Sequence, residues 1–240
     1  AQHIARYAAL CGFSASQGVP LIYPQMLTFP LVTAYMCSPE CPWPAMGTVH
    51  LANSIEQRKQ LRAGDTVRVE MGTGELFAHE KGQGFTLDLR ILRDGELVWS
   101  ATQSLLRVGV KETSGQPFAS QLALDTSLSC QTEFSAPADI GRSYGAVSGD
   151  RNPIHLAAVT AKLFGFKRAI AHGMWTKARA LSYLLPATAL EQTSASVEFK
   201  TPLLLPGRAA LWTERSAHGA QFEVRDKKGL RPHLRGQLSY

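Results

Sequence analysis

A faint internal duplication constrains the fold of this 240-residue chain more than any other feature. Residues 55–61, followed by Gly64, parallel residues 197–203, followed by Gly207, with a one-residue gap. Two later segments with a glycine turn repeat the correspondence: residues 87–90 with Gly95, and residues 222–225 with Gly229. In each half, this pattern predicts a helix followed by a strand, a glycine-containing turn and a run of long antiparallel strands.

Turn chemistry supports two similar halves. Residues 93–96 and 226–229 carry the glycine and aspartate typical of hairpin turns between later strands. From about residue 110 to residue 131, Gly, Ser, Thr and Gln are frequent and hydrophobic alternation is weak. We therefore predict a first half at 1–115, a linker at 116–131 and a second half at 132–240. Edge-to-edge pairing of the two sheets would remove exposed strand edges.

Composition sets outer bounds on the class of protein. The chain is 45% hydrophobic, which is enough for a substantial core. No apolar run reaches the ~18 residues of a membrane-spanning helix, and no basic region followed by an apolar run predicts a signal peptide. The four cysteines are irregularly spaced and lack a second ligand pair for zinc. These features favour a cytoplasmic protein with reduced thiols.

The positive charge is concentrated in one window. Residues 151–190 contain no acidic residue and six basic ones: Arg151, Lys162, Lys167, Arg168, Lys177 and Arg179. Because the whole excess of +6 lies there, the field would attract a phosphate-bearing carrier such as coenzyme A, or an acidic carrier protein. The alternative is an ordinary solvated helix face. Nucleic acid is not expected, because no recognition motif accompanies the charge.

Two short segments, one at the start of that window and one within it, carry the chemistry. Residues 144–155 supply Asp150 and His155, a carboxylate and an imidazole suited to acid and base work on water. Pro153 biases the residue before it toward an extended backbone, so the turn between them is stiff. Residues 171–185 predict a helix, whose first turn would hold Gly173. Backbone N–H groups there have no partner inside the helix and lie at its positive end.

These two segments resemble the hydratase motif of the MaoC-like acyl dehydratases, the (R)-specific enoyl-CoA hydratases also called hydratase 2. The matching residues are Tyr144, Ser148, Gly149, Asp150, Asn152, Pro153, Ile154, His155, Ala161, Gly165, Ile170, His172, Gly173 and Met174. The resemblance, with the duplication, implies the two-hot-dog form of that family. The expected fold is thus α+β, a tandem (double) hot-dog in which each half is a long helix wrapped by a curved antiparallel sheet.

The resemblance also implies an activity, the reversible hydration of a trans-2-enoyl thioester to an (R)-3-hydroxyacyl thioester in fatty acid metabolism. It implies that Asp150 and His155 form the catalytic dyad and that the Gly173 N–H holds the thioester oxygen. The residues expected to bind substrate are Asn152, Ser148, His172, Lys167, Arg168 and Met174. Of these, the Ser148 hydroxyl is also expected to hold the local backbone, and His172 to serve as a structural neighbour of the glycine.

No cofactor is expected beyond the carrier of the substrate, with coenzyme A favoured over acyl carrier protein. A metal is not expected, because His155 and His172 have no third histidine or a cysteine at ligand spacing. Association into a homodimer is left open. The competing classes are a hot-dog thioesterase, or a non-catalytic protein that binds acyl thioesters or acts as a scaffold.

The first half is expected to lack an active site. Aligning the two helix starts places Pro24 and Gln25 where His172 and Gly173 stand, and nothing before Tyr23 resembles the motif turn. The first helix, residues 24–36, would then wall an acyl pocket or simply pack the core. The side chains concerned are Leu27, Phe29, Leu31, Val32 and Tyr35.

Overall fold

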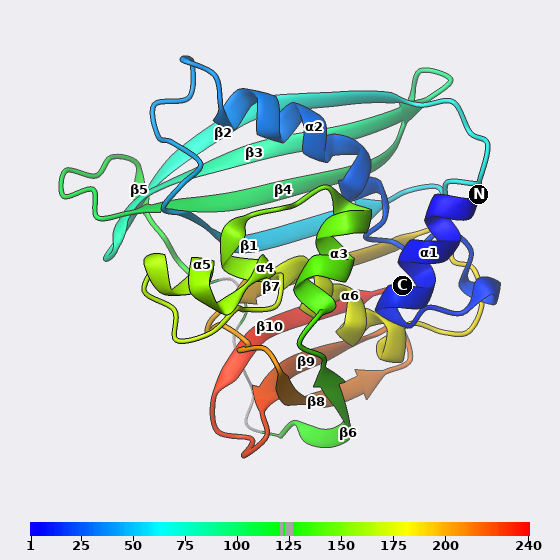
Figure 1. The fold of residues 1–240 in the computed structure, drawn as a ribbon. Coiled ribbons are helices and arrows are strands. Elements are labelled where there is room, and N and C mark those ends of the chain that lie inside the picture. The colour runs from blue at the N-terminus through cyan, green and yellow to red at the C-terminus, as the bar shows by residue number, and fades with distance from the viewer. Residues whose placement is uncertain (121, 123–126) are drawn as a thin grey trace.

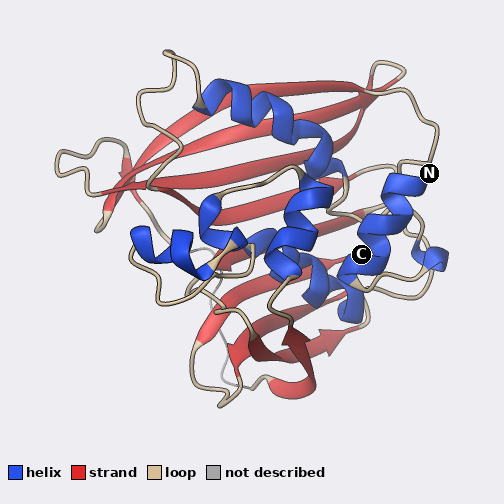
Figure 2. Cartoon of the chain, in the orientation of Figure 1, coloured by secondary structure: helices blue, strands red, loops and turns tan. Residues whose placement is uncertain are grey.

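The computed structural model describes residues 1–120, 122 and 127–240 and shows one continuous sheet with the helices gathered on one face (Figures 1 and 2). The helices are α1 Gln2–Cys11, η1 Ala15–Gln17, α2 Pro24–Met36, α3 Ile140–Ser148, α4 Pro153–Leu156, α5 Ala158–Leu163 and α6 Gly173–Leu184. The strands are β1 Thr48–Gln57, β2 Arg68–His79, β3 Gly82–Arg93, β4 Glu96–Val108, β5 Gln116–Pro117, β6 Ser129–Ala136, β7 Thr193–Phe199, β8 Gly207–Ser216, β9 Gly219–Asp226 and β10 Pro232–Ser239. Their order across the sheet is β5-β2-β3-β4-β1-β7-β10-β9-β8-β6.

The strand order confirms the tandem arrangement. Helix α2 precedes β1 to β4, and α6 precedes β7 to β10, so each half is a helix followed by four strands. The halves join at the centre of the sheet, where β1 and β7 pair antiparallel from Ala52 opposite Glu198 to Gln57 opposite Thr193. This confirms the expected edge-to-edge pairing and leaves the central strands without a free edge.

Alternation along the strands explains which face is covered. On β3, Leu87, Leu89 and Ile91 are fully buried, whereas Asp88 and Arg90 between them point to the other face. On β9, the equivalent third strand of the second half, Phe222 and Val224 are fully buried in the same core. The duplicated sequence segments therefore occupy matching strands beneath the helices.

The two long helices begin and end close to their predicted positions but bury different amounts of surface. Helix α2 buries a stripe of one residue per turn, at Pro24, Thr28, Val32 and Met36, together with Gln25 at its start. Helix α6 buries most of its length and ends one residue before the predicted limit, ahead of Pro186. Among the described residues, none of the helices has both the length and the apolar character needed to cross a membrane.

The predicted hairpins are also present. Asp94 and Gly95 form the β3–β4 turn with φ of 53° and 81°, a left-handed pair that favours this sequence. Gly229, with φ of 71°, lies in the β9–β10 loop. The proposed linker contains the short β5 and the start of β6, and part of it, residues 121 and 123–126, lies outside the described residues. The boundaries 1–115, 116–131 and 132–240 stay a prediction.

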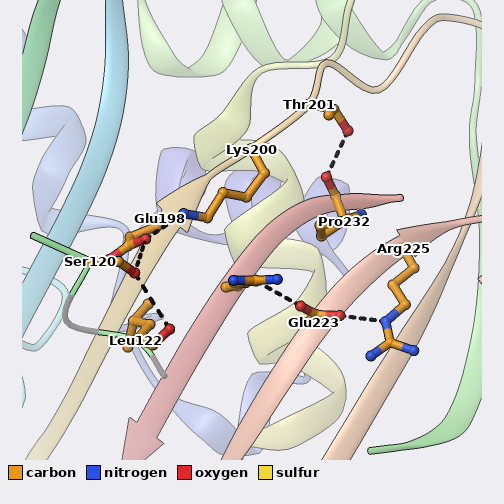
Figure 3. A network of polar contacts seen from close by, with 9 residues as sticks. Ser120, Leu122, Glu198, Lys200, Thr201, Glu223, Arg225 and Pro232 are labelled. Carbon is orange, nitrogen blue, oxygen red and sulfur yellow. Dashed lines mark hydrogen bonds and ion pairs between the residues drawn. The ribbon is translucent and has the colours of Figure 1, made fainter. Parts of the chain in front are cut away.

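Two buried carboxylates lie on the sheet face opposite α6 (Figure 3). Glu198 accepts hydrogen bonds from the Ser120 hydroxyl at 2.9 and 2.8 Å and pairs with Lys200 at 2.5 Å. Glu223 pairs with Arg225 and, at 2.8 Å, with Arg235. Because both carboxylates have cationic partners, this cluster satisfies buried charge and fastens the chain near residue 120 to the second half.

Candidate active site

The motif turn is built by short hydrogen bonds within the segment itself. Helix α3 ends at Gly149, whose φ of 82° is left-handed and favours glycine. The Ser148 hydroxyl accepts the Asp150 N–H at 3.1 Å, and Asp150 Oδ1 accepts the Asn152 N–H at 3.1 Å. Ser148 therefore holds the backbone as expected, and the Asp150 carboxylate is fixed by the next turn.

Asn152 then starts the short helix that carries His155. Its φ of −55° and ψ of 125° are extended, as the following proline requires, and its side chain accepts the Ile154 N–H at 3.3 Å. His155 Nδ1 lies 2.8 Å from the Ile170 carbonyl oxygen. A carbonyl only accepts, so Nδ1 carries the proton and Nε2 keeps its lone pair. The fold thus presents His155 as a base.

His172 packs against His155 and hydrogen-bonds the motif turn. The two rings stack with centroids 3.7 Å apart, and the Tyr144 ring lies 4.9 Å from the centroid of His172. His172 Nε2 donates to the backbone oxygen of Asp150 at 3.0 Å and lies 3.8 Å from its Oδ2. This geometry is that of a residue supporting the turn, although its predicted contact with substrate stays a prediction.

Burial sets the protonation of both imidazoles. It lowers the pKa of His155, although the Asp150 charge and the hydrogen bond to Ile170 oppose the change. It lowers the pKa of His172 further, with the neighbouring His155 acting in the same direction. Both rings are therefore neutral at pH 7, which suits a base that must accept a proton from water.

Gly173 is the first residue of α6, in the predicted first turn, but the space beside it is occupied. A Cβ atom built there would lie 2.7 Å from a ring carbon of Phe199. Strand β7 places this aromatic ring against the glycine, so a side chain larger than hydrogen would collide with it. The sequence analysis missed Phe199, since no local pattern marks the last residue of a strand that reaches another element. The His172 side chain makes no capping hydrogen bond at this helix start.

The first half reaches the motif through α2. A ring carbon of Phe29 lies 3.3 Å from where a Cβ of Gly149 would be. Val32 is buried, Leu27 and Tyr35 pack half-buried against the core, and Leu31 remains 39% exposed. The Tyr144 hydroxyl also lies 4.0 Å from Met26 Sδ. The helix therefore combines core packing with direct contacts to the motif.

The basic window separates into two kinds of residue. Lys167 and Arg168 are exposed, as attraction of a charged carrier requires. Lys177 is fully buried and donates to Asn53 O, Asn53 Oδ1 and Ala195 O at 3.2, 2.6 and 3.0 Å. Counting it in a surface field was therefore wrong. The guanidinium group of Arg179 stacks over the Tyr183 ring, so it is also less available to a charged carrier.

Three residues could each offer one metal-ligand atom. The candidate atoms of Asp150, His155 and His172 lie within 4.8 Å of one another. The expectation that no metal binds considered only histidine and cysteine as a third ligand and left out the Asp150 carboxylate. One nitrogen of each imidazole already donates to a backbone carbonyl, so each ring has one nitrogen left. Met174, the remaining predicted contact, is half-buried beside the core.

Comparison with known proteins identifies the family. Residues 111–231 match the family described as "MaoC like domain". The chain is 34% identical over 233 residues to 3-hydroxyacyl-thioester dehydratase X of Mycobacterium tuberculosis (strain ATCC 25618 / H37Rv), across 97% of this chain and 82% of the relative. The chain belongs to the MaoC-like family.

Solved structures agree with the MaoC-like assignment. A crystal structure of HtdX from Mycobacterium tuberculosis has a TM-score of 0.83 at 29% identity and covers 99% of this chain and 94% of its own. A MaoC-like dehydratase from Phytophthora capsici has a TM-score of 0.82 at 19% identity, with coverage of 100% and 92%, which shows likeness of fold alone. The tandem hot-dog fold predicted for this MaoC-like chain is therefore confirmed.

Proposed function

We propose that this MaoC-like chain is a hydro-lyase that interconverts trans-2-enoyl and (R)-3-hydroxyacyl thioesters in fatty acid metabolism. The observation that carries the proposal is the convergence of a fixed Asp150 carboxylate and a neutral His155, whose Nε2 is free to accept a proton. The printed activity of the 34% identical relative, a 3-hydroxyacyl-thioester dehydratase, supports the same reaction.

The residues define a course for the reaction. Asp150 and His155 accept hydrogen bonds from one water and turn its oxygen toward C3 of the enoyl group. As that oxygen bonds to C3, one proton passes to the dyad and the π electrons move onto the thioester oxygen. The Gly173 N–H at the positive end of α6 stabilises this enolate. The enolate then collapses and C2 takes the proton from the dyad, which restores both side chains.

The carrier of the acyl group belongs to the proposal as well. Lys167 and Arg168 are exposed between the two segments of the motif, and their charge complements the phosphates of coenzyme A. We place coenzyme A ahead of acyl carrier protein on this ground. Phe29 on α2, in contact with the motif, is the first-half side chain best placed to line the acyl path.

A direct assay tests the activity. Crotonyl-CoA and longer trans-2-enoyl-CoA thioesters should lose their conjugated absorbance when the protein is added, without release of free thiol. Release of thiol at the same rate would indicate a thioesterase instead. Binding without either change would indicate a non-catalytic protein, and the dyad would then have no chemical role.

A further inference from the structure

A break in the central strand pairing directs a first-half histidine toward the second half. Strand β1 pairs with β4 through a register shift between His50 and Ala52, and its pairing with β7 begins only at Ala52. Such a bulge changes the direction in which neighbouring side chains point. His50 therefore lies where β1 separates from β7, near the end of β7 that carries Phe199.

Ring contacts connect His50 to the start of α6. The His50 and Phe199 rings lie 5.0 Å apart between centroids, tilted by 53°. The same Phe199 ring covers Gly173. The three residues are thus connected by contacts from the first half to Gly173, whose N–H is expected to hold the thioester oxygen.

The His50 ring has an unfulfilled hydrogen-bonding atom. Its Nε2 is buried and, within the described parts of the chain, has no hydrogen-bond partner. A buried polar atom left in this condition destabilises a protein, so a partner is expected in the working enzyme. Its position beside Phe199, whose ring covers Gly173, makes a bound substrate the natural partner.

Burial keeps the His50 ring neutral at pH 7. It lowers the pKa of His50 to about 4, with the Lys177 charge acting in the same direction and the hydrogen bond to the Ala52 backbone and the Asp150 charge opposing it. A backbone hydrogen bond raises a histidine pKa when the ring donates to the carbonyl oxygen, so Nδ1 carries the proton and Nε2 keeps a lone pair. This lone pair suits an uncharged N–H donor, such as an amide.

We propose that His50 is a substrate-positioning residue supplied by the first half, and that its Nε2 accepts a hydrogen bond from the first amide N–H of the carrier arm, next to the thioester sulfur. Coenzyme A and carrier-protein thioesters share this amide. The proposal rests on the proposed function. It gives the half without a motif a direct part in holding the substrate.

Two substitutions distinguish the effect of the His50 ring nitrogens from the effect of its ring packing. His50→Phe keeps the packing against Phe199 and removes both nitrogens, so the melting temperature should stay the same or rise, while kcat/KM for crotonyl-CoA should fall about tenfold or more. His50→Gln restores a polar side chain and should recover part of that loss. His79→Phe is the matched control, because His79 also packs against a phenylalanine, Phe118, and should leave kcat/KM unchanged. Unchanged kcat/KM in a folded His50→Phe protein would overturn the proposal.

A binding measurement separates this proposal from the proposed function. In the Asp150→Asn background, which removes the catalytic carboxylate, His50→Phe should weaken binding of crotonyl-CoA about tenfold by calorimetry. Should wild type prove inactive, the function fails, but this comparison, made without turnover, still decides whether His50 contacts the thioester. Equal affinities, or no binding at all, overturn the role of His50. If His50→Phe does not fold, His50→Leu, which is smaller and equally apolar, takes its place in both measurements.

Discussion

The starts of α2 and α6 occupy the same place in the two halves but carry different chemistry. At α2, Gln25 is buried and hydrogen-bonds with Asn53 at 3.4 Å and Thr28 at 3.5 Å, so this start is filled by polar packing. At α6, a glycine takes the equivalent place and the motif turn lies beside it. One architecture thus supports a helix start filled by polar side chains and another, beside the motif, that is opened by a glycine. The difference lies in the side chains at that position and in the segment preceding the helix.

The segments that precede α2 and α6 also differ. Helices α3, α4 and α5 lie between β6 and α6, whereas α1 and η1 precede α2. The N-terminal helix nevertheless contacts the second half, since the Tyr7 ring lies 6.1 Å from the Tyr144 ring beside His172. The first half therefore packs against the candidate site of the second half, through α1, Phe29 and His50.

The largest test of this contrast concerns the dyad. Asp150→Asn and His155→Ala should each lower kcat by roughly two to four orders of magnitude, as for a positioned acid or base. The double variant should lose little more, because the two residues act on one water. Gln25→Ala, at the matching helix start, should leave kcat almost unchanged. Near-normal turnover in Asp150→Asn, or an equal loss in Gln25→Ala, would end the assignment of chemistry to the second half.

The next effect concerns Gly173. Helix propensity alone favours alanine by about 1 kcal/mol, but the Phe199 ring would lie 2.7 Å from the new methyl carbon, so Gly173→Ala should also lower the melting temperature. Turnover should fall about 100-fold if the N–H contact is displaced. Adding Phe199→Leu makes room for the methyl group and should restore stability. Recovery of full activity along with stability would place the oxyanion hole elsewhere.

Acid should loosen the region around the motif first. His155 and His172 in the second half, and His50 on the adjoining β1, have a lowered pKa when folded, so below the unfolded value of 6.5 the unfolded chain binds protons that the folded chain does not. The free energy of unfolding should therefore fall with pH below about 6.5, by up to ~1.4 kcal/mol per pH unit for each histidine. Hydrogen exchange between pH 7 and pH 5 should accelerate in α3 to α6 before β2 to β4. Uniform acceleration in both halves would contradict this localisation.

The smallest expected effect is that of surface charge. Reversal of Lys167 and Arg168 to glutamate should raise KM for an enoyl-CoA a few-fold at low salt and less at high salt, because ions screen long-range attraction. Saturated turnover should change little. Reversal of the exposed Arg62 in the first half serves as the control. An equal rise in KM for an enoyl-cysteamine thioester, which has no phosphate, would show that these residues act otherwise.

Local pattern was sufficient for the turn that opens the motif. Short-range hydrogen bonds between Asp150 and Asn152 and between Asn152 and Ile154 close it, and turn chemistry predicts it. The convergence of Asp150 with His155 was implied by the family resemblance and not by spacing alone. The helix starts, the hairpin at Asp94 and Gly95, and the duplication of strands are also local signals. Each depends on interactions between residues close in the chain, which periodicity and turn chemistry report.

The sequence by itself determined the family, the tandem fold and the motif that brings Asp150 and His155 together. The tertiary structure decided three things that no local pattern contains: the burial of Lys177 at the β1–β7 junction, the cover that Phe199 places on Gly173, and the delivery of His50 from the first half. The physical reason is that each depends on contacts between elements far apart in the chain. The His50 and Lys177 contacts depend on how β1 and β7 pair across the two halves, and a one-residue shift of that register would turn the strand side chains to the other face. The Phe199 contact depends on how β7 lies against the start of α6 within the second half.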